Sequence, residues 1–191
     1  SKNLEAAYAD ASEAVRLNPN RADSYDKRAH MLSIDFGEID RPIEDYTAAI
    51  KLEPTAYRYA QRGDLYKLKD ALDLSMADFR QAIVLLNAQI AARPDADWNY
   101  RSRSEAFRNI GDIDNALRDF NENLKRKKDS YDPPMTDRGH LFLRKADFDR
   151  AIADYTAAIE KNPDSDETRN RRALAYRLKG DTKRAIADYD Q

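Results

Sequence analysis

The chain of 191 residues contains no cysteine, only five glycines and seven prolines, and no large excess of either charge. The absence of cysteine excludes a disulfide framework, thiolate metal ligands and cysteine nucleophiles, and leaves the redox compartment undetermined. So few glycines and prolines argue against an all-β protein with many turns. The net charge of −2 does not fit a protein whose main partner is nucleic acid or an anionic membrane.

Membrane and catalytic signatures are also missing. No apolar run approaches the roughly 18 residues that a membrane span needs, so we expect no membrane partner within this segment. The two histidines, His30 and His140, lie far apart in the chain, and neither a metal pair nor a histidine relay is evident. No glycine-rich phosphate loop, G-x-S-x-G or H-E-x-x-H motif occurs. We therefore expect no enzyme, no metal site and no cofactor.

What the chain does contain is an internal repeat with a period of about 34 residues. The string Ala151–Pro163 recurs at Pro42–Pro54 and begins again at Ala185. A second string, with arginine, a small residue and an aromatic, precedes most copies, as in Arg62-Gly63-x-x-Tyr66. The apolar residues of both strings follow helical spacing. The aromatic of the first string falls, in successive copies, at Tyr46, Phe79, Phe120, Tyr155 and Tyr189.

These strings resemble the tetratricopeptide repeat. The pattern A-x3-[FY]-x2-A-x4-P is met in full at Ala151, Tyr155, Ala158 and Pro163. In the copy that ends at Pro19, Ala11 replaces the aromatic. The resemblance covers essentially the whole chain, and it implies an all-α fold, a right-handed superhelical solenoid of antiparallel helix hairpins.

The repeat boundaries predict a single array. We expect a lone helix at 2–17, hairpins at 21–52, 56–93, 97–127 and 134–161, and a partial hairpin at 166–191. Because the chain opens and closes in mid-repeat, we expect a fragment of a longer protein. The compartment stays open, since cytoplasmic, periplasmic and secreted locations fit this segment equally.

One hairpin departs from the repeat length. After Asn87 there are about seven surplus residues, which is two turns of helix. Phe79, Ile83, Leu86 and Ile90 continue one apolar face through them. The surplus predicts either a longer helix that packs on its own neighbours or a docking ridge, or self-association patch, on the convex side.

An arginine and an aspartate recur in every repeat at matched positions. The arginine precedes the small residue of the first helix, and the aspartate precedes the aromatic of the second, 16 or 17 residues later. Paired antiparallel helices bring these positions level, which predicts ion pairs. We interpret them as a structural ladder, with a ligand site as the alternative and with pairing between repeats left open. The ladder comprises Arg28, Arg62, Arg103, Arg138, Arg172, Asp45, Asp78, Asp119, Asp154 and Asp188.

The resemblance implies a function class, a non-catalytic protein–protein interaction scaffold whose first helices line a concave groove. Steps of 100° from the core positions predict the groove-facing residues. They also place Asp23, Asp26 and His30 on the first unit. The Lys and Asn set with which Hsp70/Hsp90 co-chaperones hold a C-terminal carboxylate is absent. The candidate partner-binding residues are Tyr57, Lys67, Trp98, Arg101, Arg108, His140, Arg144 and Arg177.

Tryptophan and arginine are enriched at binding hot spots, and Trp98 is the only tryptophan. The hypothesis is therefore an acidic or C-terminal peptide segment, from another protein, bound along residues 98–144. The alternative is that Trp98 packs at a helix start and the arginines are solvated. A second function class also stays open, a structural self-assembly element whose repeats stack or dimerise through convex or end surfaces. The basic run at 125–128 fits either a solvated helix end or a patch for an acidic partner.

Overall fold

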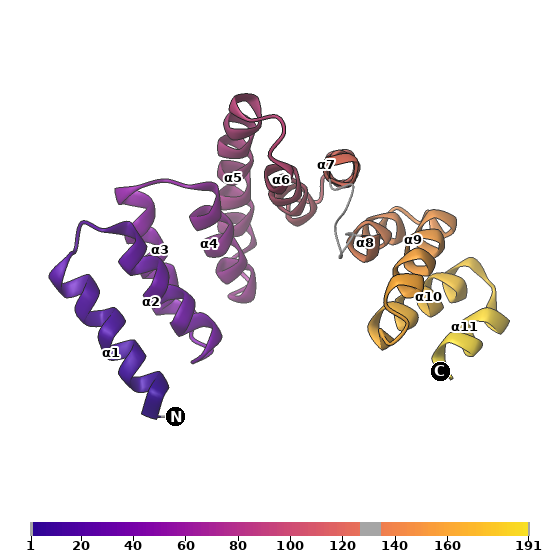
Figure 1. Cartoon of the computed structure of the whole chain (residues 1–191), viewed down its shortest axis with the longest axis horizontal. Coiled ribbons are helices and arrows are strands. Elements are labelled where there is room, and N and C mark those ends of the chain that lie inside the picture. Colours follow the sequence, from indigo (N-terminus) through magenta and orange to yellow (C-terminus); the bar gives the residue numbers. More distant parts are fainter. Residues whose placement is uncertain (1, 127–134, 191) are drawn as a thin grey trace. The chain divides into compact units, whose positions relative to one another are not determined.

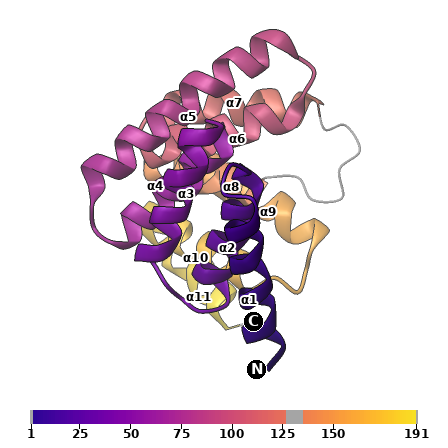
Figure 2. The same ribbon diagram turned by 90° about the vertical axis from the view of Figure 1, so that its left-hand side faces the viewer.

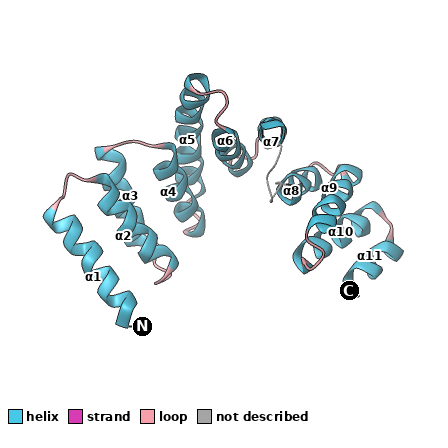
Figure 3. Ribbon diagram, in the orientation of Figure 1, coloured by secondary structure: helices cyan, strands magenta, loops and turns pink. Residues whose placement is uncertain are grey.

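The computed structural model describes residues 2–126 and 135–190, and these residues form eleven α-helices and no strand (Figure 3). The all-α class is therefore confirmed. The limits expected at residues 127, 134 and 191, and Lys127 and Lys128 of the basic run, lie outside the described residues. The helices are α1 (Lys2–Leu17), α2 (Ala22–Ile34), α3 (Asp40–Leu52), α4 (Ala56–Leu68), α5 (Leu72–Ala92), α6 (Asp97–Asn109), α7 (Ile113–Arg126), α8 (Met135–Arg144), α9 (Phe148–Lys161), α10 (Asp166–Lys179) and α11 (Thr182–Tyr189).

The helices belong to two compact units, Ser1–Ala92 and Arg93–Gln191. In unit 1 the lone helix α1 packs beside α2, and α2–α3 and α4–α5 form antiparallel hairpins (Figure 1). In unit 2 the hairpins are α6–α7, α8–α9 and α10–α11. Within each unit, consecutive hairpins also contact each other, through α3 and α4 in the first and through α9 and α10 in the second.

In α4–α5 and α8–α9 an aromatic ring on the second helix lies against a glycine on the first, whereas the equivalent ring of α11, Tyr189, is 47% exposed. Phe79 and Tyr155 are almost fully buried. A Cβ atom added at Gly63 would lie 3.2 Å from the Phe79 ring, and one added at Gly139 only 2.7 Å from the Tyr155 ring. The absence of a side chain at Gly139 therefore allows the two helices to approach each other this closely.

The corners between helices follow from local chemistry. Gly180 has φ of 91°, a left-handed conformation that suits a residue without Cβ, and it ends α10. The carboxylate of Asp181 then accepts a hydrogen bond from the backbone N–H of Arg184 and so caps α11. Gly111 has φ of 82° at the equivalent corner after α6.

Helix α5 is the longest, with 21 residues, and it continues to Ala92 (Figure 2). Phe79, Ile83 and Leu86 are buried on its inner face, and Ile90 is half-buried. The surplus residues therefore extend the helix by the expected two turns. The outer face is different, because Leu74 and Val84 are exposed there.

Candidate partner-binding surface

All five arginines of the ladder contact the aspartate of their own hairpin. Each guanidinium donates from Nε and Nη2 to the two oxygens of one carboxylate, at 2.6–2.8 Å. Such two-point contacts are among the strongest ion-pair geometries. The hydrogen bond with the aspartate raises the pKa of the arginine in four of the pairs, those of Arg28, Arg62, Arg103 and Arg172.

In three of the ladder arginines, the third guanidinium nitrogen, Nη1, donates a hydrogen bond to the preceding hairpin. It donates from Arg62 to Thr47 Oγ1 at 2.9 Å and from Arg138 to Asn121 Oδ1 at 2.8 Å. The same bond joins Arg172 to Thr156 at 3.2 Å. These acceptors stand two residues after the aspartate of the preceding hairpin. The ladder therefore pairs within hairpins and also ties one hairpin to the next.

Aromatic rings lie near four of these guanidinium groups, those of Arg28, Arg62, Arg103 and Arg138. The Arg62 guanidinium carbon lies 5.7 Å from the ring centres of both Tyr59 and Tyr66, three residues before it and four after it on α4. Cation–π contacts of this kind favour arginine over lysine. The enclosed, paired guanidinium has little freedom to leave its aspartate, which supports the structural interpretation of the ladder.

In unit 1 the predicted groove residues lie apart from one another. Tyr57 and Lys67 are exposed at opposite ends of α4. The acidic side chains expected in the groove are bound by an arginine that the repeat pattern did not single out. Arg58, whose side chain is only 4% exposed, donates to Asp26 at 2.9 Å and to Asp23 at 3.2 Å.

The same arginine donates from Nη1 to the backbone oxygen of Glu53 at 2.5 Å and to its carboxylate at 3.0 Å. Arg58 thus joins α2, α4 and the loop before α4. It places a positive charge beside Asp23 and Asp26, so these two predicted groove residues are less acidic as a surface than the sequence indicates. The signal available in the sequence was a single arginine beside a groove position, without a repeat to support it.

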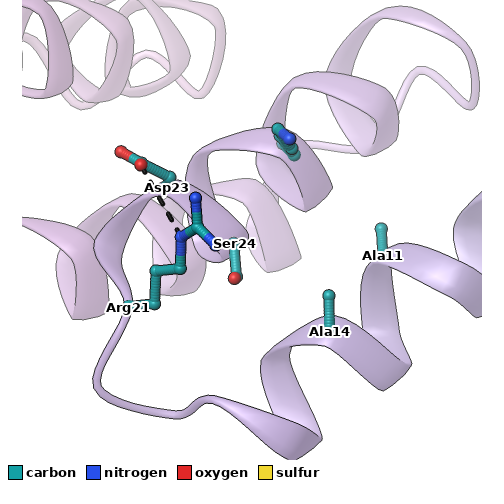
Figure 4. A pocket seen from close by; sticks show the side chains of 6 residues that line it. Ala11, Ala14, Arg21, Asp23 and Ser24 are labelled. Atoms are coloured by element: carbon teal, nitrogen blue, oxygen red, sulfur yellow. Dashed lines mark ion pairs between the residues drawn. The ribbon is translucent and has the colours of Figure 1, made fainter.

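A cavity of about 110 Å³ lies between α1 and the start of α2 (Figure 4). Ala11 and Ala14 of α1 face Ser24 and the pair Arg21–Asp23, whose Nε and Oδ2 atoms are 3.8 Å apart. Ala11 stands where other hairpins carry a buried aromatic ring. The cavity is therefore explained by packing.

Unit 2 holds most of the predicted groove residues. Trp98 at the start of α6 is 59% exposed, which contradicts the alternative in which it packs at the helix start. Arg101 on the next turn pairs with Glu105 at 3.2 Å, within its own helix. Arg177 is exposed on α10.

Two predicted arginines from different helices meet in this unit. Arg144 at the end of α8 donates from Nη1 to the backbone oxygen of Arg108, near the end of α6, at 3.3 Å. In the described parts of the chain no carboxylate lies within 4.0 Å of either guanidinium. The Arg144 guanidinium therefore lies against the backbone of α6 at Arg108, and no carboxylate among the described residues neutralises it.

His140, which the sequence predicts as a groove residue, is only partly exposed. Its ring is half-buried and lies 5.7 Å, centre to centre, from the ring of Tyr155. Burial lowers the pKa of His140, and the positive charge of Arg171 lowers it further. The imidazole is therefore neutral near pH 7, and it adds no charge to the arginines.

Lys125 and Arg126, the described residues of the basic run at 125–128, both contact other residues of unit 2. Arg126 donates to the Pro94 backbone oxygen at 3.0 Å and to the Glu122 carboxylate at 2.5 Å, and its guanidinium lies 4.2 Å from the centre of the Tyr100 ring. These contacts hold it within unit 2. Lys125 also pairs with Glu122.

Across 2–126 and 135–190 no three His, Asp or Glu side chains are grouped so that they could hold a metal ion. None of the helices described above has the length and apolar character needed to cross a membrane.

Comparison with known proteins identifies the repeat. Residues 136–191 match the family model for the tetratricopeptide repeat, and 131 residues are 33% identical to human tetratricopeptide repeat protein 13. The chain belongs to the tetratricopeptide repeat family. The human match covers 69% of this tetratricopeptide repeat chain and 14% of that protein, so the chain spans only a small part of its relative.

Solved structures extend the likeness in fold to nearly the whole chain. A chain of the APC/C hetero-tetramer Cut9–Hcn1 matches with a TM-score of 0.73 and 19% identity, covering 98% of this chain and 36% of that one. YrrB, described as a TPR protein with an unusual peptide-binding site, matches with a TM-score of 0.61 and 18% identity, covering 94% and 89%. The expected hairpin fold is thus shared with proteins of this family, which are in general non-catalytic scaffolds for protein–protein interaction.

Proposed function

We propose that this tetratricopeptide repeat chain binds an acidic peptide segment of a partner protein on the groove face of unit 2. The observation that carries the proposal is the contact of the Arg144 guanidinium with the backbone oxygen of Arg108, where neither arginine has a carboxylate neighbour among the described residues. Arginine binds carboxylates in two-point contacts, and unpaired arginines favour an acidic partner. The exposed Trp98 adds an apolar anchor on the same unit.

The test is the double substitution Arg108→Glu and Arg144→Glu. Partners are captured with the wild-type chain, identified by mass spectrometry, and measured by titration at low and moderate salt. We expect the double variant to lose at least about tenfold in affinity, because repulsion replaces attraction at two contacts.

The matched control carries the same charge change elsewhere, Arg80→Glu with Arg118→Glu. Both arginines are exposed on second helices, away from the predicted groove. The control should bind as the wild type does. Unchanged affinity of the Arg108/Arg144 variant for every captured partner would refute the proposal.

A second candidate, self-assembly, is favoured by one observation. Helix α5 has only three charged residues among 21, and Leu74 and Val84 are 52% and 59% exposed on its outer face. Exposed apolar faces often mark association surfaces. A molar mass that rises with concentration for the wild type, and stays monomeric for Leu74→Glu with Val84→Glu, would support this function.

A further inference from the structure

Two polar atoms under the groove face of unit 2 have no hydrogen-bond partner among the described residues. They are the hydroxyl of Tyr155 and Nε2 of His140. Tyr155 comes from α9 and is fully buried, and His140 comes from α8 and covers it. A buried polar atom without a partner destabilises the folded state, and native proteins keep few of them.

The packing of the hairpin does not require the hydroxyl. Phe79 and Phe120 occupy the same repeat position in two other hairpins, and they are buried as deeply as Tyr155. A phenylalanine at 155 would therefore fill the same space without the unpaired oxygen. Tyr46, at the same repeat position in unit 1, is also buried with an unpaired hydroxyl, so the oxygen alone does not indicate a site. What distinguishes Tyr155 is the second unpaired atom beside it, Nε2 of His140, whose ring centre lies 5.7 Å from that of Tyr155.

The charges around the two atoms indicate what they would bind. Arg171 of α10 is the charged side chain that acts most strongly on both Tyr155 and His140. It pairs with Glu167 one turn away, at 2.6 Å, and its side chain is 39% exposed. Exposed pairs of this kind are weak, so Arg171 can exchange Glu167 for another carboxylate.

The protonation states fit the same ligand. Burial raises the pKa of the Tyr155 hydroxyl and lowers that of His140. The phenol therefore keeps its proton and can donate it, and the neutral imidazole can donate from Nε2 when Nδ1 carries no proton. Two neutral donors beside a guanidinium match the oxygens of a carboxylate.

We propose that Tyr155, His140 and Arg171 form a subsite for one carboxylate of the bound acidic segment. The subsite rests on the proposed function, because the segment that supplies the carboxylate is the one held by Arg108 and Arg144. Both atoms are covered in this structure, so the side chains around them must move as the carboxylate enters. A side-chain rotation of this kind is common when partners bind.

The probe is a fluorescent hexaglutamate peptide with blocked termini, and hexaglutamine is its neutral control. The key variant is Tyr155→Phe, which removes one oxygen and keeps the packing. The matched control is Tyr46→Phe, the same change in unit 1. Histidine labelled with ¹⁵N gives a second readout, because the chain has only His30, in unit 1, and His140, in unit 2.

We expect hexaglutamate to shift the His140 signals and not those of His30, and Tyr155→Phe to weaken binding about tenfold while Tyr46→Phe binds normally. Peptide binding that Arg108→Glu with Arg144→Glu abolishes, but that Tyr155→Phe leaves unchanged, would overturn the subsite and leave the groove function standing. Absence of any binding of hexaglutamate at low salt would overturn both.

Discussion

The carboxylate of Asp78 offers the sharpest test of the ladder. Its side chain is 6% exposed and that of Arg62 is 15% exposed, so Asp78→Ala leaves a largely buried guanidinium without its counter-charge. Breaking a buried pair from one side costs about 3–5 kcal/mol. Arg62 keeps the Thr47 hydroxyl as an acceptor, and we therefore expect the free energy of unfolding to fall by about 3 kcal/mol, at the lower end of that range.

Urea unfolding followed by circular dichroism measures this change. The matched control is Asp40→Ala in the same unit, because Asp40 pairs with Lys69 in an exposed ion pair. The control should lose less than about 1 kcal/mol. The double variant Arg62→Met with Asp78→Ala should be more stable than Asp78→Ala alone, since it removes the uncompensated charge. Equal losses for Asp78→Ala and Asp40→Ala would refute the view that the ladder holds the hairpins.

Two further predictions concern unit 2. Gly139→Ala should lower its melting temperature although alanine favours helix, because the new Cβ would lie 2.7 Å from the buried Tyr155 ring; a higher melting temperature would contradict this close approach. His140→Gln should reduce the acid sensitivity of unit 2. Burial lowers the pKa of His140 from 6.5, and the positive charge of Arg171 adds to this, whereas the nearby carboxylates of α8 and α10 oppose it only in part. The stability that the neutral imidazole contributes is therefore complete above the unfolded pKa and is lost as the pH falls through the folded pKa. If the melting temperatures of the variant and the wild type fell by the same amount between about pH 7 and pH 5, the proposed contribution of neutral His140 to stability would be wrong.

The hairpins and the ladder could be predicted because their sequence patterns recur in several repeats. The spacing of 16 residues between Arg62 and Asp78 would predict nothing if it occurred once. Because nearly the same spacing recurs in the other repeats, the predicted structure must bring the arginine and the aspartate together in every copy. Antiparallel helices satisfy it, and the structure has an ion pair at each place. The additional bond to the preceding hairpin was not predicted, because its acceptor is threonine in some copies and asparagine in another.

Arg58 could not be predicted in the same way. It holds Asp26, 32 residues before it, and the carbonyl of Glu53, five residues before it, and no other repeat carries this set. The depth of the predicted groove residues could not be predicted for another reason. Steps of 100° give the direction of a side chain and not its depth, so Arg101 and His140 were given equal roles. The structure leaves Arg101 on the surface with Glu105 and places His140 over Tyr155.

Residues that recur in every hairpin and residues that differ between hairpins have different roles in the chain. Positions that are the same in every hairpin, such as the ladder aspartates, are buried and joined to neighbours, so they cannot change without loss of stability. Positions that differ between hairpins are free to vary, and they carry the exposed Trp98 and the arginines without carboxylate partners. Tyr155 belongs to both kinds, because all five repeats have an aromatic ring at its position but only Tyr46, Tyr155 and Tyr189 carry a hydroxyl there. In the proposed subsite the ring stabilises the hairpin and its unpaired oxygen would bind the partner, so one side chain would serve both stability and specificity.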